Sequence, residues 1–333
     1  MQIGITGATG FVGKAVLAAL KAGGHRTVAL LRHRPMNGLK ADACRVVGPM
    51  EALREPERAL RGLDVVVHLA ARVHRNPGRD DAALHEAVNA RGTAALAEAA
   101  ARAGVRRFVF VSTLKVLGEE SPSGPDGRPR AFTAADAPAP QDAYARAKAE
   151  GEARLHDIAR RTGLEPVIVR PPLVYGPGVG GNFLSLIRLA DSGMPLPFGA
   201  VRNRRSLVCV ETLADLLRAA AEHDAAPGRA LLVSDGEDLS TADLVRRLAE
   251  ALHRPARLIP VPPALLAAGL TLLGRRAAYR RIAGSLFVDI SETERRLGWS
   301  PPVPLNEALA RTAAWYGSKY GFRKLDTSRD RVY

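Results

Sequence analysis

The first thirteen residues, MQIGITGATGFVG, constrain the fold more than any other stretch of this chain. Gln2 to Thr6 alternate as a short buried strand does, and an apolar helix is expected from Phe11 to Leu20. Between them, Gly7 allows a tight turn, Gly10 lets a pyrophosphate group approach the backbone, and Gly13 lets the helix pack closely on the strand. A glycine-spaced turn that follows a strand and opens a helix is typical of a dinucleotide-binding βαβ unit.

Alternating strands and helices continue for the first half of the chain. Continuous apolar runs such as Asp64 to Ala71 predict parallel strands that are covered on both faces. Further strands are expected at 25–31, 44–47, 107–111 and 165–170, and helices at 51–60, 81–103 and 142–162. This order predicts an α/β fold, a Rossmann-type doubly wound parallel sheet with right-handed crossovers.

The pattern changes beyond residue 117. Gly118 to Gln141 is rich in Gly, Pro, Ser and Asp and reads as a long loop of the kind that often serves as a substrate lid. We expect 1–177 and 206–233 to form the dinucleotide-binding domain, with the strand, helix and strand of 206–233 returning to the main sheet. Residues 178–205 and 234–317 are expected to form a smaller mixed substrate lobe, and 318–333 a polar tail.

Composition narrows the class of protein. The formal net charge is +14, but arginines are spread over most expected helices and no basic run is interleaved with aromatic residues, which argues against nucleic-acid binding. The eight histidines show no metal-ligand spacing, so no metal is expected. The expected strand at residue 2 leaves no room for a signal peptide. We therefore expect a cytoplasmic protein in which Cys44 and Cys209 are buried, reduced thiols.

Tyr144 and Lys148 lie four residues apart on an expected helix and therefore project from one face. A lysine ammonium beside a tyrosine favours the phenolate and lowers the pKa of the phenol, which suits a general acid/base acting on an alcohol/ketone pair. The spacing alone is not specific, because it recurs at Tyr320 and Lys324. Thr113 adds context, since it follows a strand at the carboxyl edge of the sheet and its hydroxyl can hydrogen-bond the same substrate oxygen.

Six motifs in order resemble the extended short-chain dehydrogenase/reductases of the NAD-dependent epimerase/dehydratase family that act on nucleotide sugars: GATGFVG, DVVVHLAA, the N-x-x-G-T of Asn89 to Thr93, VSTLKVLG, YARAK and RPPLVYGPG. The resemblance spans about residues 1–302. It implies that Tyr144 is the catalytic acid/base, that Lys148 tunes it and holds the nicotinamide ribose, and that Thr113 orients the reacting hydroxyl or ketone. A homodimer is common in this family and is expected here.

The resemblance also implies binding residues. The cofactor is expected to contact Gly7, Thr9, Gly10, Phe11, Val12, Gly13, Arg32, Leu69, Ala70, Ala71, Asn89, Tyr144, Lys148 and Pro171. A UDP-sugar is expected to contact Thr113, Lys115, Asn182, Pro197, Arg204 and Arg205. Arg205 is the favoured diphosphate ligand, because the planar guanidinium matches phosphate geometry, and Arg204 is the weaker candidate.

The end of the second strand bears on the cofactor and the reaction. A carboxylate there would select NAD, but the strand ends in Leu30-Leu31-Arg32. Arg32 suits a ribose 2′-phosphate, so NADP(H) is favoured and NAD(H) is the alternative. Because a reductase exchanges its cofactor at every turnover, this favours reduction of a UDP-4-keto-6-deoxy-N-acetylhexosamine for polysaccharide assembly, as in the quinovosamine-forming 4-ketoreductases that the chain also resembles. A 4-epimerase with tightly bound NAD, and a non-catalytic cofactor-sensing protein, are the alternatives.

Ala264 to Gly274 is an apolar helix followed by arginines at 275, 276, 280 and 281. Weak peripheral contact with an anionic membrane surface is one interpretation of this segment. The favoured interpretation is a lobe helix that is packed on the core, with its flanking arginines solvated.

Overall fold

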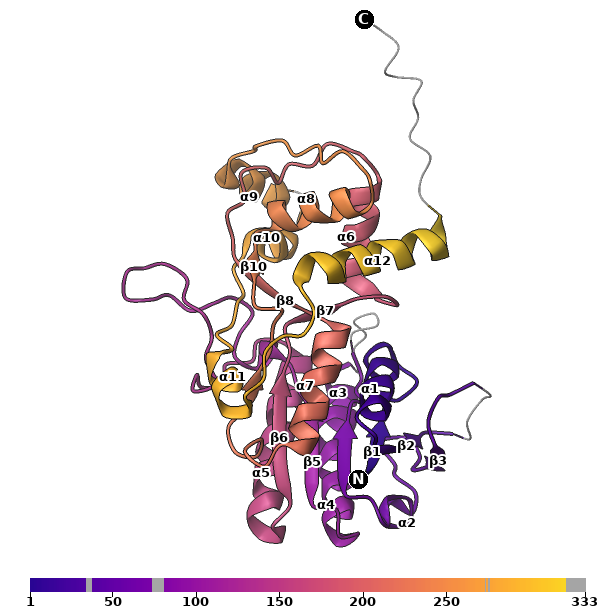
Figure 1. Cartoon of the computed structure of the whole chain (residues 1–333). Coiled ribbons are helices and arrows are strands. Elements are labelled where there is room, and N and C mark those ends of the chain that lie inside the picture. The colour runs from indigo at the N-terminus through magenta and orange to yellow at the C-terminus, as the bar shows by residue number, and fades with distance from the viewer. Residues whose placement is uncertain (34–37, 74–80, 273, 275, 322–333) are drawn as a thin grey trace, which may run out of the picture.

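The computed structural model describes residues 1–33, 38–73, 81–272, 274 and 276–321, without the side chains of 276–278. Figure 1 shows two parts stacked along the long axis of the molecule: a sheet covered by helices, and a smaller lobe above it. Among the described residues, no helix combines the length and the apolar character needed to cross a bilayer.

The larger part is a seven-stranded parallel sheet in the order β3-β2-β1-β4-β5-β6-β9. Its strands are β1 Gln2–Thr6, β2 Arg26–Leu31, β3 Ala43–Val46, β4 Val65–His68, β5 Arg107–Val111, β6 Glu165–Arg170 and β9 Leu231–Leu232. The chain leaves β1 toward one edge and returns at β4 to run toward the other, so the strand order reverses between these two central strands. The predicted doubly wound α/β fold is confirmed, and the carboxyl ends of β1 and β4 mark its ligand-binding edge.

Helices cover both faces of this sheet. One face packs on α1 Phe11–Ala22 and α7 Val210–Glu222, which also contact each other. The other face packs on α2 Pro56–Leu60, α4 Gly92–Arg102 and α5 Ala143–Thr162. Most residues of β1, β2, β4, β5 and β6 are buried, which is why these strands read as largely apolar runs in the sequence.

The smaller lobe contains a mixed three-stranded sheet in the order β10-β8-β7, built from β7 Leu173–Tyr175, β8 Arg205–Cys209 and β10 Asp238–Leu239. Its helices are α6 Gly181–Asp191, α8 Thr241–Ala251, α9 Pro263–Leu272, α10 Arg276–Ala283 and α12 Leu305–Tyr320. A short α11, Ser291–Leu297, lies beside β9 of the larger sheet. The lobe core joins α6, α8 and α12 through apolar side chains such as Phe183, Leu248 and Leu309.

Several expectations need correction. The strand after Arg205 does not return to the main sheet: β8 pairs with β7 and β10, and only β9 of the segment 206–233 joins the larger sheet. The single helix expected at 81–103 is divided into α3 Asp81–His85, a π-helical turn Glu86–Arg91, and α4. Cys44 is exposed because β3 is an edge strand, whereas Cys209 is buried as expected. The polar tail expected from 318 is helical as far as Tyr320, and Lys324 lies outside the described residues.

Candidate active site

The turn between β1 and α1 has the geometry that its glycines predict. Gly7 has φ +69°, and a Cβ there would lie 2.9 Å from the backbone nitrogen of Ala70. A Cβ on Gly13 would lie 2.2 Å from the carbonyl oxygen of Gly7, so only glycine lets the helix approach the strand this closely. At Gly10, the helix N-cap, the Gly7 oxygen at 3.1 Å is the only atom of the described residues within 4 Å of such a Cβ once the adjoining residues are set aside. The turn is therefore tight on its inner side and open at Gly10, above the first amides of α1.

A buried hydrogen-bond chain holds the neighbouring loop in place. The backbone amides of Leu69 and Ala70 both donate to the Thr6 hydroxyl oxygen at 3.1 Å, and that hydroxyl lies 2.7 Å from Nδ1 of His68. On the other side of the ring, Nε2 lies 3.0 Å from the hydroxyl of Thr93, which donates to the carbonyl of Asn89. Because the Thr93 proton is committed to Asn89, Nε2 must carry the imidazole proton and Nδ1 must accept from Thr6. This series of hydrogen bonds therefore requires the His68 imidazole to be neutral.

Burial and the nearby charge of Lys148 lower the pKa of His68 to about 3. An unfolded histidine has a pKa near 6.5, so the unfolded state binds more protons between these values and stability falls as the pH drops from 6.5 toward 3. At pH 4.5 we expect this residue to cost roughly 2–3 kcal/mol of stability relative to pH 7.5. His68→Gln keeps a donor and an acceptor but cannot titrate. Urea unfolding at both pH values should show a smaller pH-dependent loss in this variant, and an equal loss in both proteins would contradict the assignment.

Lys148 and Tyr144 lie in the first two turns of α5, and the Lys148 side chain reaches the carboxyl end of β5. The Lys148 side chain is fully buried, its Nζ donates to the carbonyl of Val111 at 2.8 Å, and it lies 4.4 Å from the centre of the Phe110 ring. The Tyr144 ring meets the His85 ring edge-on at 5.8 Å. The sequence places the pair there because Asp142 caps the helix, accepting from the Ala145 amide at 2.6 Å.

The expected lowering of the Tyr144 pKa by Lys148 is wrong. Burial and the charge of Asp142 raise the pKa of Tyr144 to about 12. The Lys148 ammonium is directed at Val111 instead, and burial lowers the pKa of Lys148 to about 7, partly opposed by the charge of Glu152. At neutral pH the phenol is therefore protonated, and the lysine is close to its own titration midpoint.

Lys115 lies in the short 3₁₀ turn η2, Leu114–Val116, and Thr113 is the N-cap residue of this turn, two residues after the end of β5. The Thr113 hydroxyl caps this turn by accepting from the Lys115 amide at 3.3 Å. The Lys115 ammonium forms ion pairs with Asp142 at 2.7 Å and Glu119 at 3.2 Å. Lys115, expected to contact substrate, thus ties the Thr113 turn to the start of the helix that carries Tyr144. The turn and the helix are in contact, so the structure brings the three expected catalytic residues to one edge.

One further polar atom at this edge is unexplained by the protein itself. The Ser112 hydroxyl, between Val111 and Thr113, is buried and has no hydrogen-bond partner among the described residues. An orphaned buried hydroxyl beside Thr113 is consistent with a site completed by a ligand or water.

A buried ion pair behind the site was missed at the sequence level. Glu152, one turn after Lys148 on α5, accepts two hydrogen bonds from the Arg170 guanidinium at the end of β6, at 3.1 and 2.6 Å. Both side chains are less than a tenth exposed. The signal was present in YARAKAEGE, where a glutamate follows the lysine at the i+4 position, but its partner arginine is eighteen residues away in the sequence.

The other expected cofactor residues are distributed along the same edge. Asn89 lies in the π-helical turn and exchanges two hydrogen bonds with the backbone of Arg72, at 2.8 and 2.9 Å. Pro171 is buried, and its carbonyl accepts from Leu114 at 2.9 Å. Arg32 is exposed directly after β2, as the sequence predicts. Half-buried or exposed positions are found for Thr9, Phe11, Val12, Leu69, Ala70 and Ala71.

The expected substrate residues of the second half lie in the smaller lobe. Arg205 is held by the carbonyls of Arg281 and Gly284 at 3.1 and 3.0 Å, and burial lowers its guanidinium pKa. Arg204 is exposed, stacks on the Phe287 ring at 4.1 Å and pairs with Asp238 at 2.9 Å. Asn182 is exposed in the first turn of α6, and Pro197 is half-buried in the following loop. These contacts hold both arginines in place within the smaller lobe.

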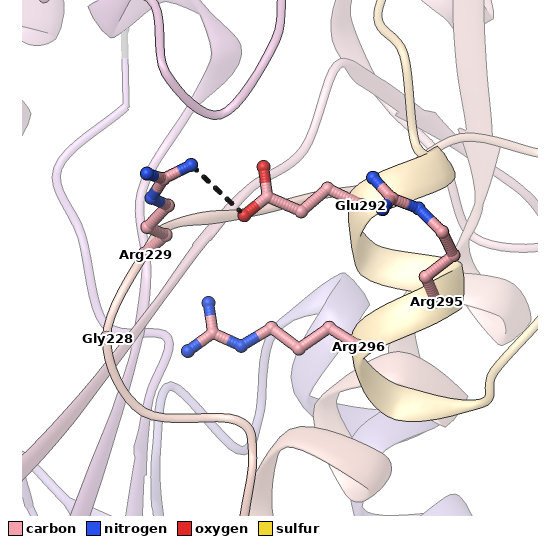
Figure 2. Close-up of a pocket in the computed structure, with 5 residues that line it drawn as sticks. All are labelled: Gly228, Arg229, Glu292, Arg295 and Arg296. Atoms are coloured by element: carbon pink, nitrogen blue, oxygen red, sulfur yellow. Dashed lines mark ion pairs between the residues drawn. The ribbon is translucent and has the colours of Figure 1, made fainter.

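Figure 2 shows the residues that line a hollow in which arginines gather around Glu292. The volume of this hollow is about 540 Å³. The hollow lies before β9, at the amino end of the parallel sheet, opposite the edge where doubly wound folds bind ligands. Its cations already have partners: Arg229 pairs with Glu292 at 3.7 Å, and Arg296 donates to the carbonyls of Ala225 and Pro227. We therefore assign this hollow to the anchoring of α11 and not to the active site.

Comparisons with known proteins agree with this geometry. The family model described as the NAD dependent epimerase/dehydratase family matches residues 3–233. A UDP-glucose 4-epimerase of Vibrio cholerae is 40% identical over 315 residues, covering 93% of each chain. Two solved structures share the fold. The first is the UDP-glucuronic acid 4-epimerase of Bacillus cereus in complex with NAD, with a TM-score of 0.76 and 23% identity over 96% of this chain and 98% of that chain. The second is the UDP-glucose 4-epimerase of Thermotoga maritima with UDP-glucose, with a TM-score of 0.74 and 22% identity over 96% of this chain and 99% of that chain.

Proposed function

Because this chain belongs to the NAD dependent epimerase/dehydratase family, we propose that it is a UDP-sugar 4-epimerase that inverts C4 of UDP-glucose or UDP-N-acetylglucosamine. The observation that carries the proposal is the similarity to the Vibrio cholerae UDP-glucose 4-epimerase, which extends over 93% of both chains. The site is consistent with it, since Thr113, Tyr144 and Lys148 gather at the carboxyl edge of the sheet.

The cradle around Gly7, Gly10 and Gly13 fits a dinucleotide, because it is closed to side chains on the inside and open above the start of α1. A bound NAD would supply an oxidant for C4 and then a reductant for the resulting ketone. The loop of Leu69 and Ala70, fixed by Thr6, would lie along the same dinucleotide, and Lys148 would hold its ribose.

Tyr144 carries the proton transfers in this proposal. Its raised pKa keeps the phenol protonated at neutral pH, which suits the step in which a C4 oxygen receives a proton. In the opposite step Tyr144 must accept the proton of the C4 hydroxyl, and positive charge near it decides how readily the phenolate forms. Thr113 would orient the same oxygen by a hydrogen bond, and Arg205 would bind the diphosphate through its remaining guanidinium donors.

A second candidate function rests on the end of β2. Arg32 is exposed there and no carboxylate follows β2 in the described residues 32–33, an arrangement that suits NADP(H). A 4-ketoreductase that uses NADPH to reduce a UDP-4-keto-6-deoxy-N-acetylhexosamine is therefore the alternative reaction for the same catalytic residues.

The test is to incubate purified protein with UDP-glucose and with UDP-N-acetylglucosamine, without added cofactor, and to separate the C4 epimers by anion-exchange chromatography. We expect interconversion of at least one pair, and we expect acid denaturation to release NAD from the purified protein. The epimerase proposal fails if neither sugar is converted to its C4 epimer. If the protein also oxidises NADPH when a UDP-4-keto sugar is added, the 4-ketoreductase is the correct function. Turnover of none of these sugars, with a thermal shift on adding cofactor, would favour a non-catalytic protein.

A further inference from the structure

The far end of the smaller lobe exposes an apolar helix. α9, with the sequence PALLAAGLTL, contains no charged residue, and Leu266 is its only residue classed as buried. Leu272 and Leu265 are 89% and 65% exposed, the two highest values among the large hydrophobic side chains that the structure describes. Ile259, in the loop that leads to this helix, is 49% exposed. The packing expected for this helix is therefore limited mainly to Leu266 and Leu270, which contact the lobe core.

The same stretch is basic and lacks acids entirely. Between Glu250 and Asp289 the sequence contains six arginines and no aspartate or glutamate. Arg254 is buried in an ion pair with Asp191 at 3.0 Å, but Arg257, Arg280 and Arg281 are exposed. We call the exposed part of this region, residues 257–272 together with 279–281, the lobe-end surface. α10 packs against α9, so Arg280 and Arg281 flank the apolar helix.

From these observations we propose that the lobe-end surface docks on a membrane that is rich in anionic lipids. Exposed leucines can enter the boundary between headgroups and acyl chains while the flanking arginines contact lipid phosphates. Figure 1 shows α9 at the end of the lobe that lies furthest from the seven-stranded sheet, so docking there leaves the sheet's ligand-binding edge away from the bilayer.

Charge favours this occupant over a second copy of the chain. In a two-fold symmetric contact the same patch meets itself, so the arginines of one copy would face those of the other with no acid from this stretch to compensate them. An anionic bilayer supplies both the negative charge and the apolar phase that this surface lacks.

The surface is also connected to the expected substrate site. The carbonyl of Arg281, at the end of α10, accepts a hydrogen bond from Arg205 at 3.1 Å. A helix that contacts lipid would therefore be one hydrogen bond away from the arginine that we expect to bind the diphosphate. The docking proposal does not depend on which reaction the enzyme catalyses.

The test is co-sedimentation of the full chain with vesicles of phosphatidylcholine alone or with phosphatidylglycerol added. We expect binding to the anionic vesicles that falls at high salt, because each arginine near the surface contributes up to about fivefold to partitioning. Leu265→Asp/Leu272→Asp should lower binding at least tenfold, since two apolar side chains leave the interface. Arg257→Glu/Arg280→Glu should lower it by a similar factor. All these side chains are exposed, so the variants should fold, as circular dichroism can verify.

Matched controls come from exposed residues elsewhere. Val46→Asp replaces a 42% exposed valine on the edge strand β3, and Arg128→Glu replaces an exposed arginine of the long loop; both should bind vesicles like the parent protein. Equal binding to neutral vesicles, or unchanged binding by the leucine variant, would overturn the proposal. Dissociation of an oligomer by the leucine variant in sedimentation velocity without lipid would also overturn it, because the surface would then be an interface between copies.

Discussion

Replacing Tyr144 by phenylalanine is expected to lower the turnover number by roughly 10²- to 10⁴-fold, the usual contribution of a positioned general acid/base. The change removes only the hydroxyl, and the ring contact with His85 at 5.8 Å can persist. Dinucleotide affinity should change little, because the glycine cradle and the Leu69–Ala70 loop are held by their own contacts, none of which involves Tyr144. Steady-state rates with a UDP-sugar, and cofactor binding by equilibrium titration, would measure the two quantities separately.

Tyr320→Phe is the matched control for this experiment. Tyr320 shares the spacing to a lysine four residues on, but it lies at the end of α12 in the smaller lobe and is 43% exposed. This variant should retain full activity. If Tyr144→Phe also retained activity, the proton transfers would have to be assigned to another residue, with Thr113 the first to test.

The sequence predicts the elements that carry their own local signals. β5 and β6 lie within the bounds expected from their apolar runs, and α5 starts one residue after Asp142, whose side chain caps it. The glycine turn is equally local, because Gly7 and Gly13 are required by backbone atoms of the turn itself and of the loop after β4. These parts follow from periodicity, capping and backbone sterics over a few residues.

What the sequence could not provide was the pairing of distant segments. The stretch from Arg205 to Leu232 has the strand, helix and strand pattern of another βαβ unit, yet β8 pairs with β7 and not with β6. Local hydrophobicity is the same for either partner, so the choice depends on where the chain goes after Pro171 and Pro172. The ion pair of Lys115 with Asp142 and the position of the Lys148 ammonium depend in the same way on how η2 meets α5. The pKa of Tyr144 was mispredicted for this reason, since helix spacing alone does not show where Lys148 points.

The Glu152–Arg170 pair gives the largest expected effect on stability. It joins α5 to β6 one turn after Lys148. Both side chains are buried, and the guanidinium and the carboxylate are linked by two hydrogen bonds. Glu152→Gln keeps the side-chain shape but leaves the Arg170 guanidinium buried without a counter-charge, so we expect a loss of about 3–5 kcal/mol in the free energy of unfolding. Glu150→Gln is the control on the same helix: its ion pair with Arg154 is exposed, and its loss should cost under about 1 kcal/mol.

The double variant Glu152→Leu/Arg170→Met separates the structural role of this pair from its electrostatic role. Removing both charges leaves neither unpaired, so urea unfolding should show most of the stability restored. The pKa of Lys148 should nevertheless fall below its present value of about 7, because the Glu152 charge that raises this pKa is absent from the double variant. The lysine would then be neutral over more of the physiological pH range, and the basic limb of the pH–rate profile should move to lower pH if activity requires the protonated lysine. A double variant as unstable as Glu152→Gln would show that the pair is required for packing α5 on β6, and not merely for charge neutrality.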